Sequence, residues 1–238
     1  MSNSSLIDYT KISPNYSGRN GQKITTIIIH HMAGNLSIEQ CGNVFANPKR
    51  QASSNYGIDS QGRVGLYVDE ANRSWCSSSA TYDRKSITIE VANNSGAPYW
   101  TVSKKAMDKL IELCADICKR NNIKKLNYTG DLNGNLIMHC WLTSTLCPGP
   151  YLKSKFDYIA EEVNKRIGAQ FKPYLIKVTV DALNIRKGPS VDYEIVTTIK
   201  DKGIYTIVSQ NGEWGLLKAY QNGRNGWINL YYTKEIKK

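Results

Sequence analysis

A short β-branched segment near the N-terminus constrains the fold more than any other feature of the sequence. Residues 23–30 read Lys-Ile-Thr-Thr-Ile-Ile-Ile-His, and a second histidine, His31, follows directly. This length and composition predict a strand buried in the middle of a sheet. Because successive side chains of a strand point to opposite faces, His30 and His31 cannot both face the same way. One of them is therefore a candidate ligand at a rigid strand end, and the other lines the site or faces the core.

The rest of residues 1–167 alternates between strand and helix patterns. Residues 56–68 contain two strand-like runs around a turn and predict a hairpin, and residues 86–92 (SITIEVA) predict another strand. Apolar residues recur at helical spacing after Ser103 and again over residues 151–167. Strands interleaved with helices predict one α/β domain, a mixed β-sheet flanked by helices.

The pattern changes after a predicted linker at residues 168–174. Residues 175–238 show short alternating runs separated by turn signals, which are Gly188-Pro189-Ser190, Asp201-Lys-Gly203, Asn211-Gly212 and Gln221-Asn-Gly223. About five short strands without a helix predict a small all-β, SH3-like barrel. We therefore expect a second, smaller domain after the linker.

Charge and compartment narrow the possible partners. The net charge is +11, and both predicted domains are basic, which suits nucleic acid or the anionic polymers of a bacterial wall. No Lys/Arg run with interleaved aromatic residues occurs, so we expect no nucleic-acid partner.

The N-terminal residues include neither a basic region nor an apolar core, which predicts no secretory signal and synthesis in the cytoplasm. No apolar run approaches the roughly 20 residues of a membrane span, so we expect no stable membrane association.

The chain has only three histidines, and all of them fall in two segments. His30 and His31 end the predicted strand, and His139 opens the motif His139-x7-Cys147. Two imidazoles and one thiolate around a tetrahedral zinc leave a fourth position for water, as in a catalytic site. The alternative is a core histidine and a buried thiol. The clustering of the histidines favours the metal site.

Four motifs occur in the order found in one enzyme family. They are TIIIHHMAG at residues 26–34, NYGID at 55–59, SITIE at 86–90 and His139…Cys147-Pro148-Gly149. Together they resemble the zinc N-acetylmuramoyl-L-alanine amidases, which include phage endolysins and animal peptidoglycan recognition proteins. The resemblance covers residues 20–165. It implies a hydrolase of bacterial peptidoglycan that cuts the amide bond between N-acetylmuramic acid and L-alanine.

The resemblance also implies roles for matched positions. The ligands of Zn²⁺ would be His30, His139 and Cys147. Glu90 would act as the general base, and Tyr56 and Thr145 would donate hydrogen bonds to the developing oxyanion. The alternatives are a solvent-facing strand residue for Glu90 and a packed aromatic for Tyr56.

Two further residues, His31 and Trp75, are candidates for substrate binding. The segment Ser74-Trp75-Cys76-Ser77 departs from the Trp-His-Ala-Gly often found in the family, so a histidine is missing there. This departure bears on substrate details and leaves the predicted ligand set intact.

The C-terminal domain resembles bacterial SH3 domains in three segments, VTVDALNIRKGPS at residues 178–190, GEWGLLK at 212–218 and GWINLY at 226–231. The resemblance implies a module that binds wall peptides or associated polymers. Aromatic surface beside basic side chains is expected from Tyr193, Trp214, Tyr220 and Tyr232, although Trp214 and Trp227 are more typical of the core of such barrels.

Together the two resemblances and the missing signal predict a phage endolysin. It would accumulate in the cytoplasm of the infected cell and act on the wall after release. A host autolysin remains open, and the sequence does not fix the oligomeric state. The alternative from another class is a non-catalytic peptidoglycan-recognition protein, which would be expected to have lost a zinc ligand.

Overall fold

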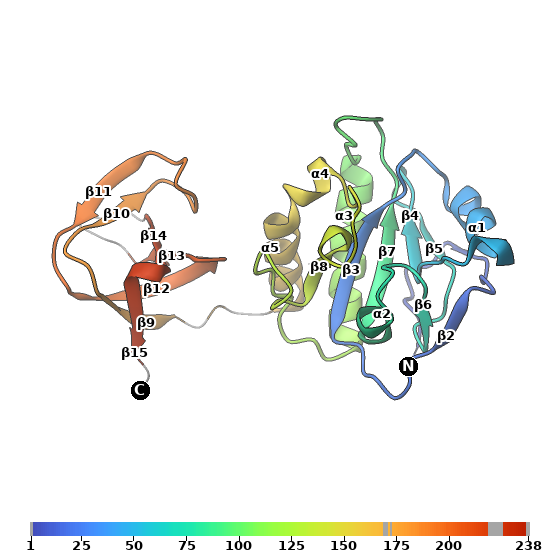
Figure 1. Cartoon of the computed structure of the whole chain (residues 1–238), viewed down its shortest axis with the longest axis horizontal. Coiled ribbons are helices and arrows are strands. Elements are labelled where there is room, and N and C mark those ends of the chain that lie inside the picture. The colour runs from blue at the N-terminus through green and yellow to red at the C-terminus, as the bar shows by residue number, and fades with distance from the viewer. Residues whose placement is uncertain (1, 169–170, 172, 219–225, 237–238) are drawn as a thin grey trace. The chain divides into compact units, whose positions relative to one another are not determined.

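The computed structural model divides the chain into two compact units, Met1–Ala169 and Gln170–Lys238 (Figure 1). The residues that it describes are 2–168, 171, 173–218 and 226–236. Three positions of the predicted linker, 169, 170 and 172, lie outside the described residues, as do Tyr220 and the turn predicted at 221–223. Each unit is described by itself.

The first unit is built on a six-stranded sheet in the order β1-β5-β4-β7-β3-β8. The strands are β1 (Tyr9–Thr10), β3 (Thr26–His31), β4 (Tyr56–Ile58), β5 (Val64–Leu66), β7 (Ser86–Val91) and β8 (Leu136–Met138). β4 and β5 are antiparallel, whereas β3 pairs in parallel with both β7 and β8. A separate antiparallel pair joins β2 (Tyr16–Gly18) to β6 (Asn72–Ser74). The predicted mixed sheet is confirmed.

Among its described residues, the first unit has five α-helices and two 3₁₀ turns. They are α1 (Ile38–Ala46), α2 (Ala80–Lys85), α3 (Lys104–Arg120), α4 (Pro150–Lys153) and α5 (Phe156–Ile167), with 3₁₀ turns η1 (Pro48–Arg50) and η2 (His139–Trp141). Ser103 caps α3 by accepting a hydrogen bond from Ala106 N, and Gly168 ends α5 with a φ of 72°.

The single helix predicted over residues 151–167 is wrong. The structure has α4 and α5 instead, because the chain tightens between them, where Lys155 N donates to the carbonyl of Leu152, three residues back.

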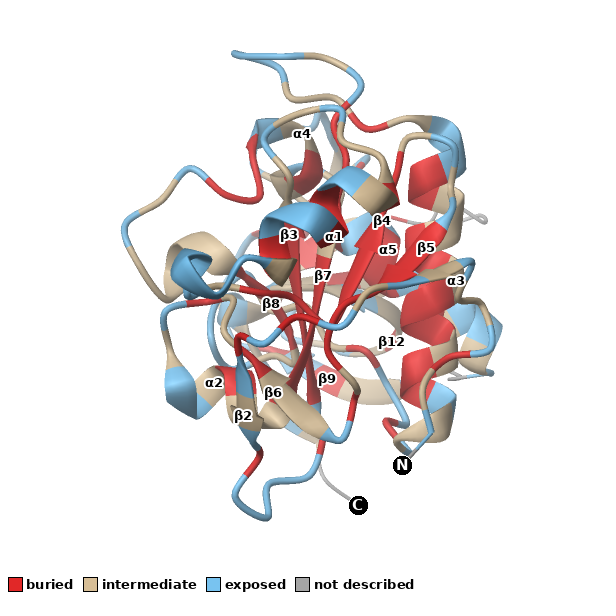
Figure 2. Ribbon diagram, turned by 90° about the vertical axis from the view of Figure 1, so that its right-hand side faces the viewer, coloured by how far each residue is buried: buried red, intermediate tan, exposed pale blue. Residues whose placement is uncertain are grey.

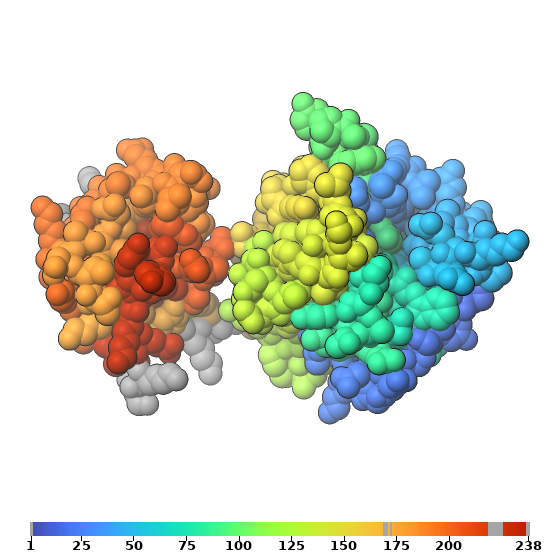
Figure 3. Space-filling view, viewed as in Figure 1, coloured from blue at the N-terminus to red at the C-terminus, as the bar shows by residue number. Residues whose placement is uncertain are grey.

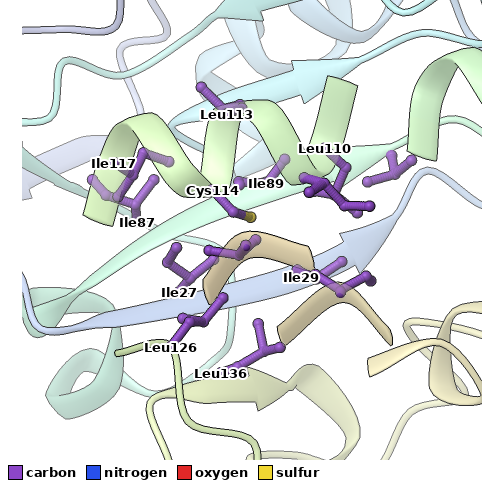
Figure 4. Close-up of a cluster of buried hydrophobic side chains, with 14 of the residues drawn as sticks. Ile27, Ile29, Ile87, Ile89, Leu110, Leu113, Cys114, Ile117, Leu126 and Leu136 are labelled. Atoms are coloured by element: carbon purple, nitrogen blue, oxygen red, sulfur yellow. The ribbon is translucent and has the colours of Figure 1, made fainter. Parts of the chain in front are cut away.

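The main core lies between the sheet and the pair α3 and α5. Ile27 and Ile29 of β3 and Ile87 and Ile89 of β7 are fully buried, and Figure 4 shows them beside apolar residues of α3, among them Leu110, Cys114 and Ile117. Figure 2 shows these strands as buried. Burying each such side chain contributes about 1.5–3 kcal/mol. This packing fixes one face of β3 and β7, so the residues between the isoleucines must point to the other face.

The opposite face is covered in part by α1. A small cluster there contains Cys41 and Phe45 of α1 and the fully buried Tyr67, whose hydroxyl donates to the carbonyl of Ile38 at 2.7 Å. The Tyr67 ring lies directly over Gly57 and Gly65, where an added Cβ would be 2.6 Å from its hydroxyl oxygen. These two glycines therefore make room for the ring.

The second unit is all β, as predicted. Among its described residues, seven strands form one sheet in the order β11-β10-β14-β13-β12-β9-β15. They are β9 (Tyr174–Val178), β10 (Leu183–Arg186), β11 (Ile195–Ile199), β12 (Ile204–Asn211), β13 (Trp214–Leu217), β14 (Trp227–Asn229) and β15 (Thr233–Ile236), and a 3₁₀ turn, η3 (Leu230–Tyr232), precedes β15. This number exceeds the five expected, and β9 and β15, the first and last strands of the unit, pair with each other.

The two tryptophans of the second unit are not in its core, contrary to the expectation. Trp214 and Trp227 are half-buried, whereas their neighbours Gly215 and Ile228 are buried. Strand alternation explains this, since the residue after each tryptophan takes the inward position. Tyr193 and Tyr232 are exposed, as expected. Within the part of the chain that is described, no helix has the length and apolar character of a bilayer-spanning segment.

The close contact over Gly57 gives a test of this packing. We expect Gly57→Ala to lower the free energy of unfolding by about 1–3 kcal/mol, because the new methyl group overlaps the Tyr67 ring. Chemical denaturation measures the change. Gly96→Ala is the matched control, since a Cβ there has no neighbour within 4 Å. Equal stability of the two variants would contradict the packing described.

Candidate metal centre

Strand register brings the candidate residues to one end of the sheet. His30 is paired with Glu90 across the parallel strands β3 and β7, and paired residues point to the same face. On the other side of β3, Ile29 is paired with Met138, the last residue of β8, and His139 follows at once in η2. The carboxyl ends of these three neighbouring parallel strands therefore bring His30, Glu90 and His139 together.

Two imidazoles and one thiol converge at this point. The Nδ1 atoms of His30 and His139 are 3.1 Å apart, and the Sγ atom of Cys147 is 3.6 Å from Nδ1 of His30. One nitrogen or sulfur atom from each residue lies within 4.8 Å of the others, so the three can hold a metal ion. The structure thus brings together the three residues predicted as ligands.

Burial keeps both histidines neutral. His30 is only 1% exposed, and burial, followed by the proximity of His139 and His31, holds its pKa well below the usual value. Burial also lowers the pKa of His139. Neutral imidazoles have the free lone pair that a metal requires. Burial and the nearby Glu90 raise the pKa of the Cys147 thiol, so a thiolate here needs a cation beside it.

Glu90 is held next to this cluster without a compensating partner. Its Oε2 atom is buried and makes no hydrogen bond within the described part of the chain. Burial raises its pKa to about 8, and the charge of Arg50 opposes the rise. A bound cation would favour the ionised form and lower this pKa. An unpaired buried carboxyl group beside candidate metal ligands is typical of a catalytic acid or base.

Cys76 is a member of the site that sequence reasoning missed. Its Sγ atom, one nitrogen of His30 and one oxygen of Glu90 lie within 4.8 Å of one another. Burial raises the pKa of this thiol well above its usual value, so it is a neutral neighbour. The signal was its position directly after Trp75, where many family members have histidine.

The predicted catalytic role of Tyr56 is wrong, because this side chain lies on the other face of the sheet. Tyr56 is paired with Ile89, and the adjacent Gly57 is paired with Glu90. The Tyr56 hydroxyl donates to Oε1 of Glu70 at 2.6 Å and accepts from Ser4 N at 3.0 Å. Arg120 of α3 completes this buried network with two hydrogen bonds to Glu70. Tyr56 therefore stabilises the fold and cannot reach the substrate.

Thr145 lies beside the candidate ligand Cys147. Its Oγ1 atom accepts a hydrogen bond from Cys147 N at 3.2 Å, which leaves its own hydroxyl hydrogen free to donate. Thr145 is half-buried. The geometry is compatible with its predicted role as a hydrogen-bond donor.

The two residues predicted to bind substrate differ in their surroundings. His31 is half-buried and meets the edge of Trp100, with the ring centroids 5.3 Å apart. Trp75 donates its indole N–H to Ser17 Oγ at 3.1 Å. That donor is committed within the protein, so only the ring of Trp75 remains for a ligand.

Residues 20–150 match the family described as N-acetylmuramoyl-L-alanine amidase. The chain belongs to this family. Residues 181–234 match the bacterial SH3 domain family. The protein is thus an amidase joined to a bacterial SH3 domain, and it hydrolyses the amide bond between N-acetylmuramic acid and L-alanine in peptidoglycan. None of the curated proteins is similar enough to the chain to match.

Solved structures of a hydrolase, an endolysin and a further catalytic domain share the fold of the first unit. The hydrolase AmiA of Staphylococcus aureus in complex with its ligand has a TM-score of 0.56 at 19% identity, covering 70% of this chain and 85% of AmiA. A mutant endolysin from Bacillus subtilis has a TM-score of 0.53 at 18% identity, covering 66% and 99%. The catalytic domain of XlyA has a TM-score of 0.52 at 16% identity, with the same coverage. The fold is therefore common to sequences that differ widely.

The position of Tyr56 gives a direct test of its structural role. We expect Tyr56→Phe to keep kcat/KM within a factor of about two, because the ring stays in place and the hydroxyl does not face the site. The free energy of unfolding should fall by about 1–3 kcal/mol, since Glu70 loses a buried donor. Wall hydrolysis and chemical denaturation measure the two effects. A large loss of kcat at unchanged stability would restore the catalytic assignment.

Glu90 gives a test based on pH. In the metal-free protein the unfolded chain releases this proton near pH 4.5, whereas the folded protein keeps it up to about pH 8. The unfolded state therefore binds fewer protons in this window, and stability falls as pH rises through it.

Glu90→Gln removes this dependence and abolishes activity. We expect Tm of the variant minus Tm of the wild type, both with chelator, to grow from pH 5 to pH 8. A constant difference would show that Glu90 is not held in its neutral form.

Proposed function

We propose that the chain is a zinc-dependent N-acetylmuramoyl-L-alanine amidase of the phage endolysin type. The observation that carries the metal assignment is the spacing of the three ligand atoms. At zinc bond lengths, tetrahedral geometry places two nitrogens about 3.3 Å apart and a nitrogen and a sulfur about 3.6 Å apart. The corresponding distances here are 3.1 Å and 3.6 Å. The residues present therefore fit the ion before it binds.

The chemistry of the donors also favours zinc over other common ions. Two imidazole nitrogens and one thiolate suit a borderline-soft metal, whereas Mg²⁺ and Ca²⁺ require oxygen ligands. Three protein ligands leave one coordination position for water or substrate, which distinguishes a catalytic from a structural site. His30, His139 and Cys147 would hold the ion.

The proton transfers of the reaction and the hydrogen bond to the developing oxyanion are assigned to the chain's own residues. Bound zinc would supply a Lewis acid and lower the pKa of coordinated water toward neutrality. Glu90, whose Oε2 has no other partner within the described residues, accepts the proton of the attacking water. It then returns this proton to the nitrogen of L-alanine as the amide bond breaks. Thr145 donates its hydroxyl hydrogen to the carbonyl oxygen as negative charge develops there.

The biological setting is proposed from the two domains and the charge. The bacterial SH3 domain would hold the enzyme on peptidoglycan or its associated polymers, and the net charge of +11 favours an anionic wall. We place the protein in the cytoplasm of the producing cell, from which it reaches the wall after release. Nucleic acid and stable membrane association are not part of the proposal.

The second candidate is a peptidoglycan-recognition protein that does not cut. The geometry disfavours it, because all three ligand atoms and an unpaired buried carboxyl group are in place.

Metal removal tests the proposal on Gram-positive cell walls. We expect new N-terminal L-alanine to form with the enzyme, to disappear with a chelator and to return with Zn²⁺. Cys147→Ala should lose bound zinc, measured by metal analysis, and lower the activity at least a hundredfold, because one of three ligands is gone. Cys140→Ala is the matched control, since the Cys140 thiol belongs to neither group of potential ligands.

Other products would each overturn a different part of the proposal. New reducing sugar ends would identify a glycosidase, and other free amino termini an endopeptidase. Activity that resists chelation would exclude zinc. Wall binding without new ends would favour the recognition protein.

A further inference from the structure

An uncharged loop borders the metal centre. Residues 93–101, Asn-Asn-Ser-Gly-Ala-Pro-Tyr-Trp-Thr, connect β7, which carries Glu90, to the start of α3, and we name them the rim loop. The loop has no charged side chain, although the chain as a whole has 31 Lys and Arg and 20 Asp and Glu. Its composition is amide, hydroxyl and aromatic.

The rim loop touches both segments that supply the candidate ligands. Asn93 N donates to the carbonyl of Gly34 at 2.9 Å, just after the histidine pair. The Trp100 ring meets His31 edge-on. Gly149, two residues after Cys147, is so close that an added Cβ would be 3.2 Å from the Cβ of Trp100. The loop is therefore continuous with the site.

The conformation of the rim loop is fixed by its own hydrogen bonds. Asn93 Nδ2 donates to the carbonyl of Trp100 at 2.8 Å, and Trp100 N donates to the carbonyl of Gly96 at 3.0 Å. Thr101 Oγ1 bonds Ser95 Oγ at 2.7 Å. These bonds hold Trp100 at a φ of 49°, which is strained for a bulky residue. Because the loop is already ordered, binding a ligand to it loses little conformational entropy.

The rim loop exposes one large ring to solvent. Tyr99 is 70% exposed, although the residue after it is packed against the site. In Figure 3 the bright green segment at this point of the chain projects from the surface beside the yellow segment that contains α4. An aromatic face on a rigid support next to a catalytic centre is suited to binding a ligand by stacking.

The chemistry of the rim loop selects the sugar part of the substrate. The stem peptide of peptidoglycan carries carboxylates. The glycan chain of alternating glucosamine and muramoyl units, whose muramoyl carboxyl group is bound in the amide, is neutral and rich in hydroxyl groups. Tyr99 offers a surface for the C–H face of a sugar ring, and the side-chain amide nitrogen of Asn94 offers a hydrogen-bond donor. An uncharged, polar and aromatic loop matches the neutral chain and not the acidic peptide.

We propose that the rim loop is a saccharide-binding subsite, in which Tyr99 stacks on a sugar ring of the glycan strand next to the amide that is cut. Trp100 positions the loop by packing against His31 and Gly149. This inference rests on the amidase function proposed above and specifies which part of the substrate the rim loop binds.

The test compares two substrates that share the scissile amide. One is a glycan-linked muramoyl peptide, and the other is a lactyl-L-alanyl peptide of the same sequence without sugar. We expect Tyr99→Ala to lower kcat/KM on the first roughly three- to tenfold and to leave the second unchanged. Tyr99→Phe should behave as the wild type because it keeps the ring. Tyr158→Ala, which removes an exposed tyrosine from α5, is the matched control.

A binding measurement separates failure of the subsite from failure of the amidase function. Peptide-free glycan oligosaccharides are titrated calorimetrically into zinc-loaded Glu90→Gln, with and without Tyr99→Ala. The same three- to tenfold loss of affinity is expected, and it can be observed even if the wild type releases no L-alanine. Unchanged saccharide affinity, or an equal fall of kcat/KM on both substrates, would overturn the subsite.

Discussion

The parallel pairing of β3 with β7 and β8 is the interaction on which the site depends. It places His30 beside Glu90 and brings the end of β8 to the end of β3, where His139 begins the next turn. A shift of one residue in either register would move a ligand to the opposite face. The alternate isoleucines Ile27, Ile29, Ile87 and Ile89 oppose such a shift, because it would move members of this set out of the core that they form with α3. The hydrophobic core thus fixes the geometry of the metal centre.

Two buried carboxyl groups, one on each face of the sheet, differ in their hydrogen-bond partners. On the core face, the carboxylate of Glu70 accepts hydrogen bonds from Arg120 and from the Tyr56 hydroxyl. On the site face, the buried Oε2 atom of Glu90 has no hydrogen-bond partner within the described residues, and burial raises the pKa of this residue. The unpaired carboxyl group therefore lowers the stability of the fold at the position where the reaction requires an acid or base. A cation bound by the adjacent ligands would compensate for that loss and make the carboxylate available as a base.

The two units suit different parts of one task. The first unit carries the candidate catalytic centre in a fold that it shares with a hydrolase and an endolysin less than 20% identical to it. The second provides a basic β-domain of the bacterial SH3 family with exposed tyrosines. Attachment of such a module to the wall would raise the local concentration of the catalytic unit near its substrate without any change in the site.

The sequence by itself determined the fold class and the three candidate metal ligands, and its resemblance to the amidase family named Glu90 as the candidate base. It did so because these depend on local patterns: the Ile-rich strand that ends in His30, the His139-x7-Cys147 motif and the strand bearing Glu90. Tertiary structure decided which face each neighbour takes. Tyr56 and Glu90 lie on adjacent strands, yet only the pairing of Tyr56 with Ile89 shows that the tyrosine faces the core. Likewise, Trp100 joins the site through contacts with His31 and Gly149, which lie far from it in the chain, and no local pattern contains these contacts.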